Sequence, residues 1–221
     1  MSLGWLLDGT QVPTLTMIKP GPLALTHLLY LHGFRSSPHS TKARQVADWV
    51  LRHRGDLVWW CPQLPPSPGL AMQLLLDGTR DWPAARMGVI GSSLGGFYAA
   101  ALVQRLGCRA VLLNPAVHPA RDLARHIGET TSWHGDEPFH FRPEYVDELH
   151  ALAGGEQLHP ERICAVIAKG DEVLDWREMA ARHAASRIHL LEGGDHALSN
   201  FTELLPQVLA ELGLDDTLTS R

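Results

Sequence analysis

A serine with glycines two residues before and after it constrains the fold of this chain more than any other feature. An apolar run at 87–92, typical of a buried strand, leads into Gly91-Ser92-Ser93-Leu94-Gly95, and a helical pattern follows at 97–106. This arrangement predicts a nucleophile elbow, a sharp strand-to-helix turn that presents a serine hydroxyl at the end of a sheet. Glycine is expected to be required at positions 91 and 95, because a side chain there would prevent the close approach of strand and helix. Ser93 is expected to take a strained backbone angle.

Two alternatives apply to the same motif. Glycine and serine are common residues, so the segment could instead form a phosphate-binding loop or a simple tight turn. Ser92 is the alternative nucleophile, but only Ser93 has glycine at both flanking positions.

Apolar runs alternate with helical patterns along most of the chain. The strands are predicted at 27–31, 57–61, 87–92, 110–113, 162–168 and 187–191, and the helices at about 40–50, 72–76, 97–106, 176–185 and 201–212. Either Ser37-Pro38 or Ser40 is expected to cap the first helix, and Pro206 to kink the last one. Alternating strands and helices predict an α/β fold with a mainly parallel sheet and helices on both faces.

The segment 116–160 interrupts this rhythm. It lacks a strand pattern, is rich in histidine, arginine and aromatic residues, and is expected to form two short helices near 121–126 and 143–152. An insertion of this length within a domain is usually functional, so we predict a short helical lid or binding loop. The length of 221 residues suits one domain, 1–221, with residues 1–24 as an N-terminal extension.

Composition excludes several classes of protein. A net charge of −5 argues against a nucleic-acid binder, and no apolar run is long enough to cross a bilayer. The N-terminus lacks the pattern of a secretory signal. Three widely spaced cysteines without a CxxC pair are expected to be reduced, buried thiols, which predicts a cytoplasmic protein.

Two later loops supply the partners that a serine nucleophile needs. Residues 170–175 and 193–196 each follow a predicted strand, so they are expected at the same edge of the sheet as Ser93. Their order along the chain, with the acid before the histidine, is that of an α/β-hydrolase triad. We therefore predict His196 as the general base and Asp171 as the acid that orients it. Glu172 and Asp175 are alternatives for the acid, whereas Asp195 is expected to form a turn.

Two backbone N–H groups are expected to bind the developing oxyanion. One belongs to Leu94, at the positive end of the helix after Ser93. The other is assigned to Phe34, in the loop after the first strand, where Gly33 permits a tight backbone path. His32 is expected to hold this loop by hydrogen bonds rather than to transfer protons.

The insertion contains a histidine-rich stretch and a group of aromatic residues. His134-Gly135-Asp136 with His140 matches no strong metal-ligand motif, so we predict neither a metal nor a cofactor. Four aromatic residues are expected either to line an acyl pocket or to pack the insertion against the domain: Trp133, Phe139, Phe141 and Tyr145.

Several segments together resemble the YqiA-type esterases, which are small bacterial α/β-hydrolases. The segments are Leu29–Pro38, Pro62–Pro66, Gly91–Gly96, Asn114–Val117, Gly170–Asp175 and Glu192–Ala197. The resemblance extends from about Leu28 to the final helix. Residues 1–24 and 118–160 depart from it.

The resemblance implies a triad of Ser93, Asp171 and His196 that hydrolyses carboxylic esters, with acyl thioesters such as acyl-CoA as further candidates. The expected partner is thus a small acyl substrate rather than nucleic acid or membrane. Acyl-chain length and oligomeric state stay open. The alternatives are a non-catalytic protein that binds a small ligand, or another triad enzyme such as a peptidase, lactonase or haloperoxidase.

Overall fold

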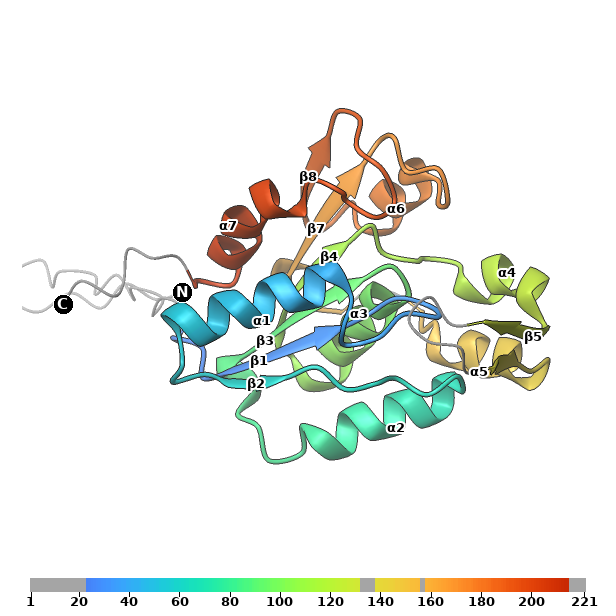
Figure 1. Cartoon of the computed structure of the whole chain (residues 1–221), viewed down its shortest axis with the longest axis horizontal. Coiled ribbons are helices and arrows are strands. Elements are labelled where there is room, and N and C mark those ends of the chain that lie inside the picture. Colours follow the sequence, from blue (N-terminus) through green and yellow to red (C-terminus); the bar gives the residue numbers. More distant parts are fainter. Residues whose placement is uncertain (1–22, 132–137, 156–157, 215–221) are drawn as a thin grey trace, which may run out of the picture.

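Six parallel strands form the central sheet of the protein (Figure 1). The computed structural model describes residues 23–131, 138–155 and 158–214. Across the sheet the strands follow the order β2-β1-β3-β4-β7-β8. Their bounds are β1 His27–Leu31, β2 Val58–Trp60, β3 Met87–Ser92, β4 Arg109–Leu113, β7 Ile163–Ala168 and β8 Arg187–Leu191. The predicted parallel sheet is confirmed, and each strand matches an expected apolar run to within three residues at either end.

Helices cover both faces of this sheet, as predicted. On one face pack α2 (Pro68–Gly78), α3 (Leu94–Leu106) and α6 (Trp176–Arg182), and on the other α1 (Thr41–His53) and α7 (Phe201–Glu211). Successive residues of a strand point to opposite faces. In β4, for example, Leu112 joins the core beneath α3, whereas Leu113 joins the core beneath α1 and α7. Burial on both sides explains why the strands read as continuous apolar runs.

The helix ends agree in part with the expected caps. Helix α1 begins directly after Ser40, whose side chain makes no capping hydrogen bond. The Ser37 hydroxyl instead accepts the N–H of His39 within the preceding turn. Pro206 lies inside α7, where it removes one backbone N–H from the helix.

The insertion 116–160 contains strands, so the prediction of a strand-free segment was wrong. Strands β5 (Gly128–Thr131) and β6 (Pro138–Phe141) form an antiparallel pair, between α4 (Pro119–Leu123) and α5 (Glu144–Leu152). Each strand has four residues, too few to establish a period of two against the surrounding polar sequence. The two expected short helices are present, and with β5 they lie beyond the carboxyl ends of the main strands (Figure 1).

The cysteines and the lengths of the helices were the subject of two predictions. All three cysteines are free; Cys108 and Cys164 are buried, and Cys61 is half-buried. Within the part of the chain that the structure describes, none of the helices combines the length and apolar character needed to cross a bilayer. The cytoplasmic location and the division into one domain with a lid remain predictions.

A buried histidine after α6 makes stability depend on pH. The His183 residue is 3% exposed, and burial, with Arg182 nearby, lowers the pKa of His183 from 6.5 to about 4. As the pH falls through this interval, the unfolded chain binds a proton that the folded chain does not. We expect His183 to lower the free energy of unfolding by up to about 3 kcal/mol between neutral pH and pH 4.

Urea denaturation at neutral and mildly acidic pH measures this effect. Other groups also titrate in this interval, so the informative quantity is the difference between the wild type and His183→Gln. The variant should lose less stability on acidification. An identical loss in both proteins would contradict the prediction.

Candidate active site

The three predicted catalytic side chains meet at the carboxyl edge of the sheet. Ser93 follows β3, Asp171 follows β7 and His196 follows β8. The His196 Nε2 atom lies 3.0 Å from Ser93 Oγ, and His196 Nδ1 lies 2.7 Å from Asp171 Oδ2. These contacts join residues 103 and 25 positions apart in the chain.

The contacts of His196 with Asp171 and Ser93 determine which nitrogen of its imidazole carries the proton. The ionised carboxylate of Asp171 only accepts hydrogen bonds, so it holds the imidazole with its proton on Nδ1. The Nε2 atom is then free of a proton and accepts the hydroxyl of Ser93. The Asp171 side chain is fully buried and that of His196 is 20% exposed, so the imidazole lies between the interior and the solvent.

The elbow has the close approach expected of it. Ser93 has φ 55°, a left-handed value, and directly precedes α3. A Cβ added at Gly95 would lie 2.1 Å from the carbonyl oxygen of Leu31, and one at Gly91 would lie 2.3 Å from the carbonyl oxygen of Gly95. Both contacts are with backbone atoms, which cannot rotate away. The two glycines therefore let β1, β3 and α3 pack at this separation.

Substitution of an elbow glycine should disrupt folding. We expect Gly95→Ala to lower the free energy of unfolding by about 3 kcal/mol or more, because α3 must move away from β1. Gly55→Ala is a matched control, since a Cβ there meets nothing within 4 Å. Urea denaturation of the two variants provides the comparison. Equal midpoints would show that the elbow tolerates a side chain at Gly95.

Asp171 is held by hydrogen bonds on both carboxylate oxygens. Its Oδ1 accepts the backbone N–H groups of Val173 and Leu174, each at 2.8 Å, while Oδ2 faces His196. The alternative acids make different contacts. Glu172 accepts the backbone N–H of His196 at 2.9 Å, and Asp175 caps α6 by accepting the N–H of Arg177. Of these three carboxylates, the structure places only Asp171 against the imidazole.

Asp195 forms the turn expected of it. Its carboxylate accepts the N–H and the hydroxyl of Ser199, at 2.8 and 2.5 Å. The hydrogen bonds from Ser199, with a smaller contribution from the charge of Lys42, lower the pKa of Asp195. The carboxylate therefore stabilises the loop that carries His196.

The loop after β1 lies against Ser93, where an oxyanion would form. A Cβ added at Gly33 would be 3.3 Å from Ser93 Cβ and 3.7 Å from Ser93 Oγ, so a side chain there would crowd the Ser93 hydroxyl. Phe34 follows directly. Leu94 is the first residue of α3, and its N–H consequently has no acceptor within the helix. The assignment of these two N–H groups to an oxyanion hole stays a prediction.

His32 has structural contacts. It is 3% exposed, its Nε2 accepts the N–H of Leu64 at 3.1 Å, and its Nδ1 donates to the carbonyl of Gly33 at 3.0 Å. These bonds tie the loop after β1 to the proline-rich loop after β2, as the sequence predicted.

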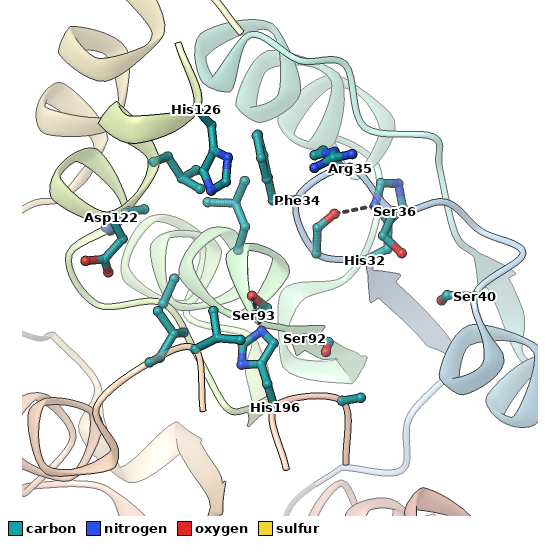
Figure 2. Close-up of a pocket in the computed structure, with 18 of the residues that line it drawn as sticks. His32, Phe34, Arg35, Ser36, Ser40, Ser92, Ser93, Asp122, His126 and His196 are labelled. Atoms are coloured by element: carbon teal, nitrogen blue, oxygen red, sulfur yellow. Dashed lines mark hydrogen bonds between the residues drawn. The ribbon is translucent and has the colours of Figure 1, made fainter. Parts of the chain in front are cut away.

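A cavity of about 560 Å³ opens beside Ser93. Figure 2 shows Ser93 and His196 together, with Phe34 and His126 across the cavity from them. Its wall includes apolar side chains from α3, from the insertion and from the loop 170–175 that carries Asp171, here called the acid loop, namely Leu94, Pro119, Leu123, Val173 and Leu174. Arg35, Lys42 and Arg125 supply positive charge, opposed by Asp122 and Glu172.

Among the described residues of the insertion, none of the aromatic side chains lines this cavity. Phe139 and Phe141 instead pack edge-on against Phe34, with ring centroids 5.1 and 5.4 Å away, and Tyr145 packs against Phe141. They therefore support Phe34 from behind, which favours the packing alternative. Trp133 lies outside the described residues.

Ser92 also lines this cavity (Figure 2). It ends β3 and is 7% exposed, whereas the His196 Nε2 atom lies 3.0 Å from the Oγ atom of Ser93. The geometry therefore favours Ser93 over Ser92 as the nucleophile.

His134, Gly135 and Asp136 lie outside the described residues, and His140 is exposed. Elsewhere in the described ranges, the possible ligand atoms of Cys164, His189 and Glu211 lie within 4.8 Å of one another. Arg187 and His189 already bind the Glu211 carboxylate, at 3.2 and 2.8 Å, and the arginine would repel a cation.

Sequence reasoning missed the contacts that two residues of this site make. Asn114 and Glu172 both hydrogen-bond to the main chain of the His196 loop. Asn114 was predicted to end a strand and lies in one of the segments that resemble the YqiA-type esterases, and Glu172 was considered only as an alternative acid. One sequence signal could have identified Asn114: it is a polar residue directly after a buried strand, so it is expected at the same edge of the sheet as the triad.

Comparisons with known proteins concern the family and the fold of the chain. Residues 27–212 match the family described as "Uncharacterised protein family (UPF0227)". A provisionally named hydrolase from Agrobacterium vitis S4 is 18% identical, with a TM-score of 0.64 over 86% of this chain and 91% of its own. Est1E from Butyrivibrio proteoclasticus, solved with ferulic acid bound, is 13% identical, with a TM-score of 0.61 over 86% and 89%.

The esterase domain of a Rhodothermus marinus protein is a third similar structure. It is 20% identical, with a TM-score of 0.58 over 86% of this chain and 85% of its own. Together these likenesses identify the α/β-hydrolase fold. At such identities they show the fold alone.

Proposed function

The chain belongs to the UPF0227 family, the YqiA-type family that its motifs resemble, and we propose that it is a serine hydrolase of carboxylic esters or acyl thioesters. The observation that carries this proposal is the continuous hydrogen-bonded line from Ser93 through His196 to Asp171, beside a largely apolar cavity. A protein that only bound a ligand there would have no need for a base on the serine hydroxyl. The esterases among proteins of this fold add support.

The first half of the reaction transfers the acyl group to the protein. Ser93 Oγ attacks the carbonyl carbon of the substrate while its proton passes to His196 Nε2. Asp171 stabilises the resulting imidazolium, and the N–H groups of Phe34 and Leu94 bind the oxyanion. The intermediate collapses as the carbon–oxygen or carbon–sulfur bond breaks. The leaving alcohol or thiol takes the proton from His196.

The second half releases the acid. His196 accepts a proton from water as the water oxygen attacks the acyl carbon, and it returns this proton to Ser93 Oγ when the ester bond to the serine breaks. The cycle balances without a cofactor.

The insertion is proposed to shape the acyl site. It contributes Ala116, Pro119, Leu123 and His126 to the cavity wall, and Phe139 and Phe141 support Phe34. Because this segment departs from the YqiA-type pattern, the acyl preference should be specific to this chain.

Labelling with a fluorophosphonate probe tests the proposal. This probe phosphonylates a serine hydroxyl that an adjacent base activates, and mass spectrometry identifies the modified residue. Labelling at Ser93 in the wild type, and its loss in His196→Ala, is the expected result. Labelling at Ser92 would move the nucleophile, and no labelling of folded protein would favour the ligand-binding alternative.

A substrate panel then separates the enzyme classes. Matched ester, thioester and amide substrates with the same acyl chain distinguish an esterase or thioesterase from a peptidase. Lactone substrates test the lactonase alternative. Turnover of the ester or thioester above the amide and the lactone is expected. Varying the acyl chain would show which lengths the cavity accepts.

A further inference from the structure

Asn114 has a backbone conformation that is unfavourable for most residues with a side chain. It stands at the carboxyl end of β4, is 1% exposed, and has φ 41° directly before Pro115. Left-handed backbone is unfavourable for residues with a side chain, although asparagine tolerates it better than most. A buried polar residue in such a conformation is usually kept by the contacts that its side chain makes.

The side-chain amide of Asn114 joins two loops of the site. Its Nδ2 donates to the carbonyl oxygens of Asp195 and His196, at 3.0 and 3.2 Å. Its Oδ1 accepts the N–H of Ala168 at 2.8 Å. Ala168 ends β7, three residues before Asp171. The amide therefore bonds both the strand that leads to the acid and the loop that carries the base.

The residues beside Asn114 contact the nucleophile. The carbonyl of Leu113 accepts the N–H of Ser93 at 2.9 Å, and the N–H of Ala116 donates to the carbonyl of Ser93 at 3.0 Å. The turn 113–116 is thus bonded to the main chain of Ser93 on one side. On the other side, through Asn114, it is bonded to the loop of His196.

The order of the strands makes such a connection necessary. From β3, which carries Ser93, the sheet continues to β4, β7 and β8, so the loop after β8 crosses the ends of two strands before His196 reaches the serine. Other contacts bind this loop to the acid loop and, through a hydrogen bond from Lys42 to the carbonyl of Ala197, to α1 rather than to β4. Glu172 accepts the N–H of His196, and Gly170 donates to the carbonyl of Gly193 at 3.1 Å.

We infer that Asn114 is a positioning residue that sets the place of the Asp171–His196 pair relative to Ser93. The inference rests on the proposed function. Without the amide, the acid and base loops remain bonded to each other. They lose their side-chain tie to β4 and can move together away from the nucleophile. Since a displacement of about 1 Å can cost a hundredfold in rate, such a shift should be visible in kinetics.

Two variants remove the tie in different ways. Asn114→Gly suits the left-handed backbone and deletes the amide, whereas Asn114→Asp keeps an acceptor for Ala168 and places a carboxylate against two carbonyl oxygens. The control is Thr79→Val. Thr79 is 3% exposed, its hydroxyl donates to the carbonyl of Leu75, and it follows α2 at the opposite edge of the sheet.

The rate of Ser93 labelling by a fluorophosphonate, kcat and KM for an ester, and thermal unfolding are measured for all four proteins. Both Asn114 variants should label and turn over about a hundredfold more slowly, with KM unchanged. Thr79→Val should lose comparable stability and keep its rates. Rates in the Asn114 variants that match those of the control would overturn the inference.

A crystal structure of Asn114→Gly separates this inference from the proposed function. It should show a longer Ser93 Oγ–His196 Nε2 distance, with the His196–Asp171 hydrogen bond intact. Unchanged distances overturn the inference, and so does loss of both hydrogen bonds. By contrast, a wild-type protein that neither labels nor hydrolyses esters overturns the proposed function, and the crystallographic distances still test the role of Asn114.

Discussion

Ser93→Ala should abolish ester turnover and leave the protein folded. Removing a triad nucleophile costs roughly 10⁵ to 10⁶ in kcat, because His196 then has no Ser93 hydroxyl to activate. The substitution removes one hydrogen bond, the one to His196, and creates little cavity because Ser93 lies at the open site. Steady-state hydrolysis and thermal unfolding of the purified variant provide the two measurements.

Ser93→Gly is the matched control for this variant. Both substitutions remove the hydroxyl, but glycine also relieves the left-handed backbone at φ 55°. Ser93→Gly should therefore be equally inactive yet more stable than Ser93→Ala, by roughly 1 kcal/mol. Substantial activity in both variants, with loss of activity in Ser92→Ala, would assign the chemistry to the neighbouring serine.

Asp171→Asn should lower kcat by about 10⁴ with little change in KM, as the wrong histidine tautomer is then favoured. The asparagine oxygen can still accept the N–H groups of Val173 and Leu174, which leaves the amide NH₂ facing His196. An NH₂ group cannot accept the Nδ1 proton, so the imidazole carries its proton on Nε2. It then has no lone pair to accept the proton of Ser93.

Asp175→Asn is the control for the change of charge. Asp175 lies four residues further along the same loop, and asparagine also caps a helix well, so α6 should keep its start. The ratio of kcat between the two variants is the decisive quantity. If Asp175→Asn reduced kcat as much as Asp171→Asn, loss of negative charge near the site would explain the result, and the orienting role of Asp171 would be rejected.

Local sequence patterns determined most of the fold and the identity of the triad candidates. Apolar runs and helical periods located the strands and helices because burial on one or both faces dictates those periods. The glycines around Ser93 marked the elbow because only glycine fits where β1, β3 and α3 touch. His196 was separated from the other histidines by its place after a strand, since parallel strands bring their carboxyl ends to one edge.

Other features depended on contacts that no local pattern encodes. The β5–β6 pair is stabilised by tertiary packing, with Phe141 buried against Phe34 from a loop more than a hundred positions earlier. The choice among Asp171, Glu172 and Asp175 needed the loop conformation, because all three carboxylates lie within five residues of sequence. Only the folded chain directs one toward the imidazole, one toward a backbone N–H and one toward a helix end.

Asn114 shows most clearly the difference between what local sequence predicts and what tertiary contacts decide. Its sequence context predicted the end of a strand, and that much follows from the apolar run before it and the proline after it. Its bonds to Ala168, Asp195 and His196 connect residues 54 to 82 positions apart. Hydrogen bonds between such distant residues depend on the order of strands in the sheet, which is decided when the whole chain packs around its core. The sequence therefore determined which groups could react, and the tertiary structure decided how they are held together.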